Sequence, residues 1–206
     1  MLPRFRRGFF LAAMLLAGLL LLSCRGGEKE VSKTPGATQP AGAGTAGAQN
    51  CLPGKPDPSA PLVTADDIPV AYTPGCGWDE FPPPILETCN EPLVPEAPDL
   101  RGLWEAYSGM VGHIERIEQC GNRVVITAGG VIHDMRADGT LENGVNDVSG
   151  WECQPIEVAA EFVDGQLQLR PFGGPVAVTR ELDGEELVWV FAGSTSRLKR
   201  ICNLPE

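Results

Sequence analysis

Short runs of β-branched and aliphatic residues, separated by turn dipeptides, fill the chain beyond Asp99. This rhythm is typical of an antiparallel all-β meander, because Gly, Asn and Asp tolerate the positive φ angles of tight hairpins. Residues 166–170 alternate polar and apolar side chains, which indicates a strand with one wet and one buried face. We therefore expect a small antiparallel up-and-down meander or barrel of about eight strands over residues 99–206.

The same runs predict where the strands lie. After a first strand that opens at Gly102, we expect strands at 113–119, 123–127, 131–136, near 141, and at 156–162, 166–170, 176–182, 186–191 and 196–202. Two glycine pairs, Gly129-Gly130 and Gly173-Gly174, are expected to mark bends or bulges where strands turn the corners of a barrel.

The N-terminus has a different pattern. Three arginines precede an uncharged apolar run over residues 8–22, which ends at Ser23-Cys24. A basic start followed by a short apolar run predicts a signal peptide, since a membrane-spanning helix needs roughly 20 apolar residues.

Leu21-Leu22-Ser23-Cys24 resembles the lipobox of bacterial lipoproteins, in which the cysteine thiol receives a diacylglycerol before the signal is removed. The resemblance implies loss of residues 1–23 and attachment of acyl chains such as palmitate to Cys24. Several chains give stable anchoring, so the expected partner is a cell-envelope membrane. By resemblance to enterobacterial lipoprotein sorting, Arg25 rather than aspartate after the cysteine implies the outer membrane, on its periplasmic or surface face. The alternative is an ordinary secretory signal with a chance cysteine at its end.

Six further cysteines are Cys51, Cys76, Cys89, Cys120, Cys153 and Cys202. An even number in an exported chain predicts disulfides. Three lie before residue 95 and three after it, and because three is odd, complete pairing needs at least one bridge between the two regions. We expect Cys120 to pair with Cys153, and Cys202 with Cys89 or Cys76. No C-x-x-C motif occurs, which leaves a zinc or redox site without support.

Two segments separate the signal from the expected barrel. Residues 24–60 hold almost no large apolar side chains, so they are predicted to be a lipidated, flexible linker. Residues 61–98 are rich in proline but also carry apolar residues, and we expect them to form a strap that disulfides pin to the barrel. The formal net charge of −11 argues against a nucleic-acid partner, because an acidic surface repels phosphate backbones.

The densest polar cluster lies within residues 131–147. It supplies the candidate ligand or polar site, formed by His133, Asp134, Asn143, Asn146 and Asp147. A calcium loop of the EF-hand kind fails there, because Arg136 and Val145 stand where oxygen ligands are needed. The alternative interpretation is a pair of structural turns.

Catalytic and cofactor motifs are missing from the sequence. His113 and His133 are the only histidines, and His133 and Asp134 should point to opposite faces of a strand. Nucleophile-elbow, P-loop and dinucleotide motifs are absent from the sequence. We therefore expect no enzymatic activity, no cofactor and no metal site.

Gly102-Leu103-Trp104 on the first strand, with Arg197 or Arg200 on the last, resembles the G-x-W motif and terminal arginine of lipocalins and their calycin relatives. The resemblance implies an up-and-down barrel in which Trp104 plugs one end and the arginine stacks across it. The short domain implies a narrow barrel. The other large aromatics, Trp151 and Trp189, are expected in the core, and Trp78 in the strap; an aromatic ligand shelf is the alternative.

Two functions remain open from the sequence. The first is a lipoprotein whose small barrel binds an apolar small molecule or a partner protein of the envelope. The second is a structural or interaction module with a filled core and no ligand; a hydrolase has little in its favour. A continuous cavity of roughly 300 Å³ or more would favour the first.

Overall fold

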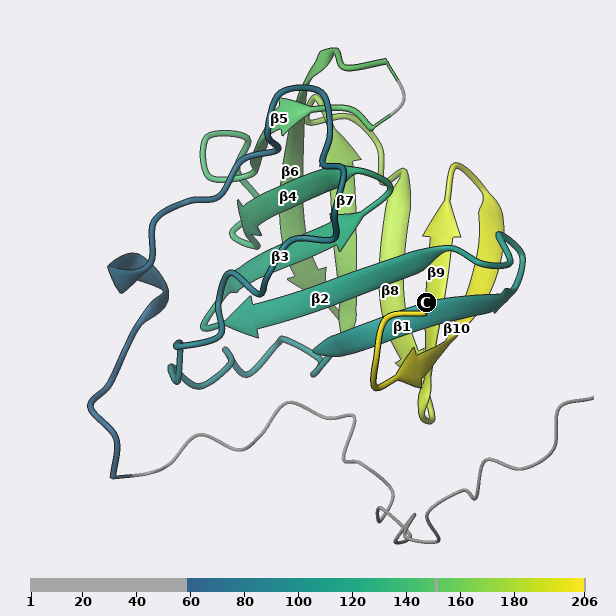
Figure 1. Cartoon of the computed structure of the whole chain (residues 1–206). Coiled ribbons are helices and arrows are strands. Elements are labelled where there is room, and N and C mark those ends of the chain that lie inside the picture. Colours follow the sequence, from purple (N-terminus) through teal and green to yellow (C-terminus); the bar gives the residue numbers. More distant parts are fainter. Residues whose placement is uncertain (1–58, 151, 206) are drawn as a thin grey trace, which may run out of the picture. The chain divides into compact units, whose positions relative to one another are not determined.

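The computed structural model describes residues 59–150 and 152–205 (Figure 1). The predicted signal peptide, the part of the predicted linker before residue 59, Cys24, Cys51 and Trp151 lie outside this range. A short 3-10 helix, η1 (Ala65–Asp67), precedes the strands. Within the described residues, none of the helical structure is both long and apolar enough to cross a bilayer.

Ten antiparallel strands form one sheet in this part of the chain, in the order β4-β3-β2-β1-β10-β9-β8-β7-β6-β5. They are β1 (Gly102–Ser108), β2 (Ile114–Cys120), β3 (Arg123–Ala128), β4 (Val131–Arg136), β5 (Val145–Val148), β6 (Pro155–Val163), β7 (Gln166–Pro171), β8 (Val178–Asp183), β9 (Glu186–Phe191) and β10 (Ser194–Ile201). The predicted all-β up-and-down fold is confirmed, with ten strands rather than about eight.

The sheet curls into a barrel that is almost closed. Its two outermost strands are β4 and β5, and single contacts of β4 and the segment after it with the turn before β5 and with β6 replace a regular ladder. The backbone N–H of Arg136 donates to Asn143 (2.7 Å), and an isolated bridge links Asp138 to Glu161. These contacts bring the first half of the sheet against the second without completing the hydrogen-bonded ring.

Thr73 supplies a further link between β4 and β5. Its hydroxyl accepts a hydrogen bond from the backbone of Ile132 (2.9 Å), and its own backbone N–H donates to the Asp147 carboxylate (2.8 Å). A residue of the segment before β1 therefore bonds a backbone group of β4 and a side chain of β5. Unpaired edges are costly when buried, so this segment completes the barrel as well as covering it.

The turns follow the predicted chemistry with two corrections. The Asp164-Gly165 turn has positive φ at both residues, 51° and 77°, as a tight hairpin requires. Gly129-Gly130 forms such a turn between β3 and β4, and Gly173-Gly174 lies in the β7–β8 connection, so neither pair is a bend within a strand. The strand expected near 141 begins instead at Val145, because a hydrogen bond from the Gly144 N–H to the Leu141 carbonyl closes a turn there.

One end of the barrel is plugged as the lipocalin-like motif implies. Trp104 is fully buried, and its indole N–H donates to the carbonyl of Leu100 (2.9 Å). The Arg200 guanidinium lies 4.4 Å from the centroid of this ring. Arg200 is thus the stacking arginine, whereas Arg197 forms an ion pair with Glu186.

The strap covers the outer face of β2, β3 and β4, and Figure 1 shows it crossing these strands in blue. Leu86 and Trp78 of the strap pack against Val125 and Ile132 of the barrel in a second apolar cluster. Every residue of β3 is buried, because one face of this strand meets the barrel core and the other meets the strap.

Two disulfides join the strap to the barrel, Cys76–Cys153 and Cys89–Cys120. A bridge between the two regions was predicted and is confirmed. The specific pairing of Cys120 with Cys153 is wrong, because each of them bonds to a strap cysteine. Cys202 is also disulfide-bonded, but not to Cys76 or Cys89. Spacing alone does not encode which cysteines the fold brings together.

Candidate ligand cavity

The connections that follow β1, β3, β5, β7 and β9 lie at the end of the barrel opposite the Trp104 plug, because adjacent strands run antiparallel. A cavity of about 400 Å³ lies at this end. Its apolar walls come from both halves of the sheet and include Ile126, Val131, Leu169 and Val178. The barrel is therefore packed at one end and hollow at the other.

The rim of this end is also apolar. Met110 and Phe191 line the cavity and are themselves exposed. Val111 and Phe172, in the β1–β2 and β7–β8 connections, are 73% and 67% exposed. Phe172 has a φ of 53°, a conformation that bulky side chains rarely adopt. Exposed apolar side chains gathered at one end of a barrel mark a surface for contact with a ligand, a partner protein or a membrane.

Arg180, which lines the cavity, belongs to a buried ion pair. Arg180 of β8 contacts the carboxylate of Glu115 of β2 through two hydrogen bonds, Nε to Oε1 (3.0 Å) and Nη2 to Oε2 (2.7 Å). Glu115 is fully buried. Burial raises the pKa of Glu115, but the charge of Arg180 and the hydrogen bonds from His113 and Arg180 outweigh it and lower that pKa to about 2. Glu115 is thus ionised and offsets the charge of Arg180.

Aromatic rings flank this ion pair. His113 lies 3.4 Å from the Glu115 carboxylate, and its ring stacks on Trp189 with centroids 4.4 Å apart. The Arg180 guanidinium lies 5.5 Å from the centroid of Trp189. The polar part of the wall is therefore built as a unit, in which each side chain orients the next.

His133 lines the same cavity from β4. Its Nε2 lies 3.1 Å from the carbonyl oxygen of Val148 in β5, so Nε2 carries the proton and donates it. Burial lowers the pKa of His133, which favours the neutral ring. His133 thus presents no charge to the cavity and helps to hold β4 beside β5.

The other candidate site residues line a different cavity. Asp134, Asn143, Asn146 and Asp147 border a space of about 340 Å³ between the strap and the β4–β5 region. His133 and Asp134 face opposite sides of β4, as strand geometry predicts.

These four side chains are engaged with the protein itself. Asp134 accepts hydrogen bonds from Arg123 and from the backbone of Ala71, and Asp147 accepts one from the strap. Asn143 donates to Asp138, and Asn146 donates to three carbonyls of the preceding turn. Their contacts hold the strap and the turn in place.

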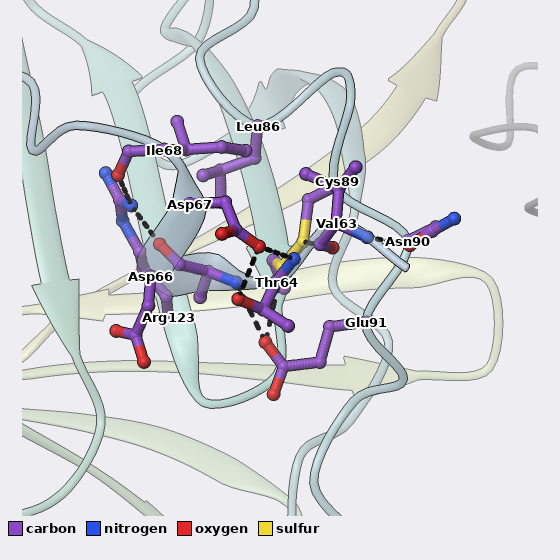
Figure 2. Close-up of a disulfide and its surroundings, with 12 residues drawn as sticks. Val63, Thr64, Asp66, Asp67, Ile68, Leu86, Cys89, Asn90, Glu91 and Arg123 are labelled. Atoms are coloured by element: carbon purple, nitrogen blue, oxygen red, sulfur yellow. Dashed lines mark hydrogen bonds between the residues drawn. A yellow bond between two sulfur atoms is a disulfide. The ribbon is translucent and has the colours of Figure 1, made fainter. Parts of the chain in front are cut away.

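The described residues contain one group with metal-ligand spacing, namely Cys89, Glu91 and Cys120. The two cysteines form a disulfide, and a disulfide supplies no thiolate. Figure 2 shows this bridge beside the strap residues Val63, Thr64 and Asp67. The group is part of the attachment of the strap.

The Glu115–Arg180 pair was not identified from the sequence, although a signal exists there. Glu115 shares strand parity with the buried Ile117, and Arg180 shares it with the buried Val178. Two opposite charges at inward-facing positions predict a buried pair. Their meeting across the barrel depends on sheet closure, which local patterns do not encode.

We compared the chain with protein-family models, curated proteins and solved structures, and none of the three comparisons gives a match.

Proposed function

We propose that the protein is a non-enzymatic lipoprotein of the cell envelope whose barrel binds a small, mainly apolar molecule. The observation that carries the proposal is the cavity of about 400 Å³ at the hollow end of the barrel. Ligand sites in proteins span roughly 300–1,000 Å³ and have mostly apolar walls with a few fixed polar groups. The cavity meets both criteria, and its apolar rim provides a route of entry.

The filled module without a ligand is the second candidate. The packed interior around Trp104 supports this second candidate. The filled module does not account for the apolar walls at the other end. A catalytic role is not proposed for the histidines, because His113 contacts Glu115 and Trp189 while His133 contacts Val148.

The binding proposal is tested by titrating a neutral apolar fluorescent dye, N-phenylnaphthylamine, into the mature chain carrying Cys24→Ser. We expect saturable fluorescence. Val178→Trp places a large ring at the cavity wall and should abolish that signal, whereas Val190→Trp is the control. Val190 alternates with the buried Trp189 on β9 and is only half-buried. Absence of saturable binding in the unmodified barrel would favour the filled module.

The anchoring part of the proposal rests on the sequence around Cys24 and is tested separately. Cells grown with labelled palmitate should yield a labelled protein in the membrane fraction. Cys24→Ser should lose both the label and the membrane association. An unlabelled wild-type protein would leave a freely secreted, disulfide-bonded barrel.

A further inference from the structure

Two hydrogen-bond donors of the cavity wall have no acceptor. Nη1 of Arg180 and Nε1 of Trp189 are buried without a hydrogen-bond partner among the described residues. The two residues are 5% and 6% exposed, pair across β8 and β9, and both line the cavity. Both groups only donate, and leaving buried donors unpaired is costly. A ligand that brings an acceptor oxygen to this place would remove that cost.

The charge of the wall decides which kind of acceptor fits. The charge of Arg180 is offset by two hydrogen bonds to the Glu115 carboxylate. Glu152 lies on the cavity lining as well, and His133 contributes no positive charge. An anionic ligand would meet the Glu152 carboxylate, and the arginine among the described lining residues, Arg180, is already paired with Glu115. An uncharged oxygen avoids this repulsion and still accepts from the unpaired donors.

We propose that the cavity recognises an uncharged hydrogen-bond acceptor, such as the carbonyl of a ketone, ester or amide, carried on an apolar body. The juxtaposition that carries the inference is the unpaired Nη1 of Arg180 and Nε1 of Trp189 beside a guanidinium that Glu115 already neutralises. The inference rests on the proposed binding function and specifies its ligand class. A cavity of about 400 Å³ holds roughly a dozen non-hydrogen atoms, at about 30 Å³ for a group the size of water.

The experiment compares three molecules of matched length: nonanone, nonane and nonanoate. Each displaces N-phenylnaphthylamine from the mature chain carrying Cys24→Ser at neutral pH. We expect nonanone to bind about tenfold more tightly than nonane, since a site built with polar donors rejects the analogue that lacks the acceptor. Nonanone should also bind more tightly than nonanoate. Equal binding of nonanone and nonane overturns the inference but leaves the binding function intact, whereas no displacement by any molecule overturns both.

Two variants test the role of the ion pair. Arg180→Lys keeps a positive charge near Glu115 but removes Nη1, and it should reduce the preference for nonanone over nonane, because only Nε1 of Trp189 remains as an unpaired donor. Arg197→Lys, which changes a paired arginine on the outer face, is the matched control and should keep it. Glu115→Gln removes the charge that neutralises Arg180, so the preference should move about tenfold towards nonanoate.

The order of affinities in the unmodified chain keeps the inference falsifiable if a variant fails to fold. Nonanoate binding most tightly to the unmodified chain would overturn it, because the site would then be an anion site. An undiminished preference for nonanone in a folded Arg180→Lys protein would also overturn it, because Nη1 of Arg180 would then make no contact with the ligand.

Discussion

Arg123 and Asp134 form a buried ion pair on the outer face of the barrel, with 2.6 Å between Nη2 and Oδ2. The same guanidinium donates to the backbone carbonyls of Ala65, Ile68 and Pro69 in the strap, and Figure 2 shows Arg123 beside Ile68. The Asp134 carboxylate also accepts from a strap N–H. One pair of residues on the β3–β4 hairpin thus holds a stretch of the strap through four hydrogen bonds.

Arg123→Ala should destabilise the protein by about 3–5 kcal/mol. It leaves the Asp134 charge buried without its ion-pair partner and removes the donor that the strap carbonyls bind. Urea denaturation measures this loss. Arg197→Ala is the control, since its ion pairs with Asp183 and Glu186 are more exposed and should contribute less than about 1 kcal/mol. A similar small effect for both variants would show that the strap does not depend on Arg123.

The strand pattern could be predicted from the sequence because it depends on residues close together in the chain. Alternation and turn dipeptides depend on neighbouring residues, so β4 and β9 were predicted with their observed bounds. The region around residue 141 was misplaced because Asp138 hydrogen-bonds to Thr140 and Asn143, which stabilises a turn where apolar Leu141 suggests a strand.

The cavity and the cysteine pairing could not be predicted, because they depend on contacts between residues far apart in the sequence. Cys76 and Cys153 are 77 residues apart in sequence, and only the path of the strap brings them together. Glu115 and Arg180 meet because the sheet closes and places β2 opposite β8. The alternation of side chains along a strand predicts which of them point inward, but it does not predict which residue each one meets across the barrel.

Removal of either strap disulfide should lower stability. Cys76–Cys153 and Cys89–Cys120 span 77 and 31 residues, and a chain-entropy argument gives about 4 kcal/mol for each. Paired serine substitutions and urea denaturation measure the effect. Only loss of Cys76–Cys153 should also weaken dye binding, because Cys153 follows Glu152, which lines the cavity. Equal loss of binding in both variants would contradict this distinction.

Stability should fall in acid because of Glu115. Its pKa is lowered from 4.5 to about 2 by Arg180 and His113 despite burial. The unfolded chain therefore binds a proton at higher pH than the folded one. The stabilisation is complete above about pH 4.5 and is lost as the pH falls towards 2.

The size of this contribution is roughly 3 kcal/mol, at about 1.4 kcal/mol for each pKa unit. Glu115→Gln removes the titrating group, so the difference in unfolding free energy between wild type and variant should narrow between pH 5 and pH 2. Unfolding curves at a series of pH values measure it. A constant difference over that range would show that Glu115 does not titrate with the expected shift.

Gly144 holds the turn after β4 against β6, and this contact leaves no room for a side chain. A Cβ at Gly144 would lie 2.0 Å from the carbonyl oxygen of Val158, a backbone atom that cannot rotate away. Gly144→Ala should therefore force the turn away from β6 and cost about 2 kcal/mol or more. Gly165→Ala is the control, because its Cβ meets nothing within 4 Å and only its φ of 77° is unfavourable, which costs about 1 kcal/mol. Thermal unfolding of the two variants should show that Gly144→Ala is the less stable. The reverse order would mean that the turn can move away from β6 without loss of stability.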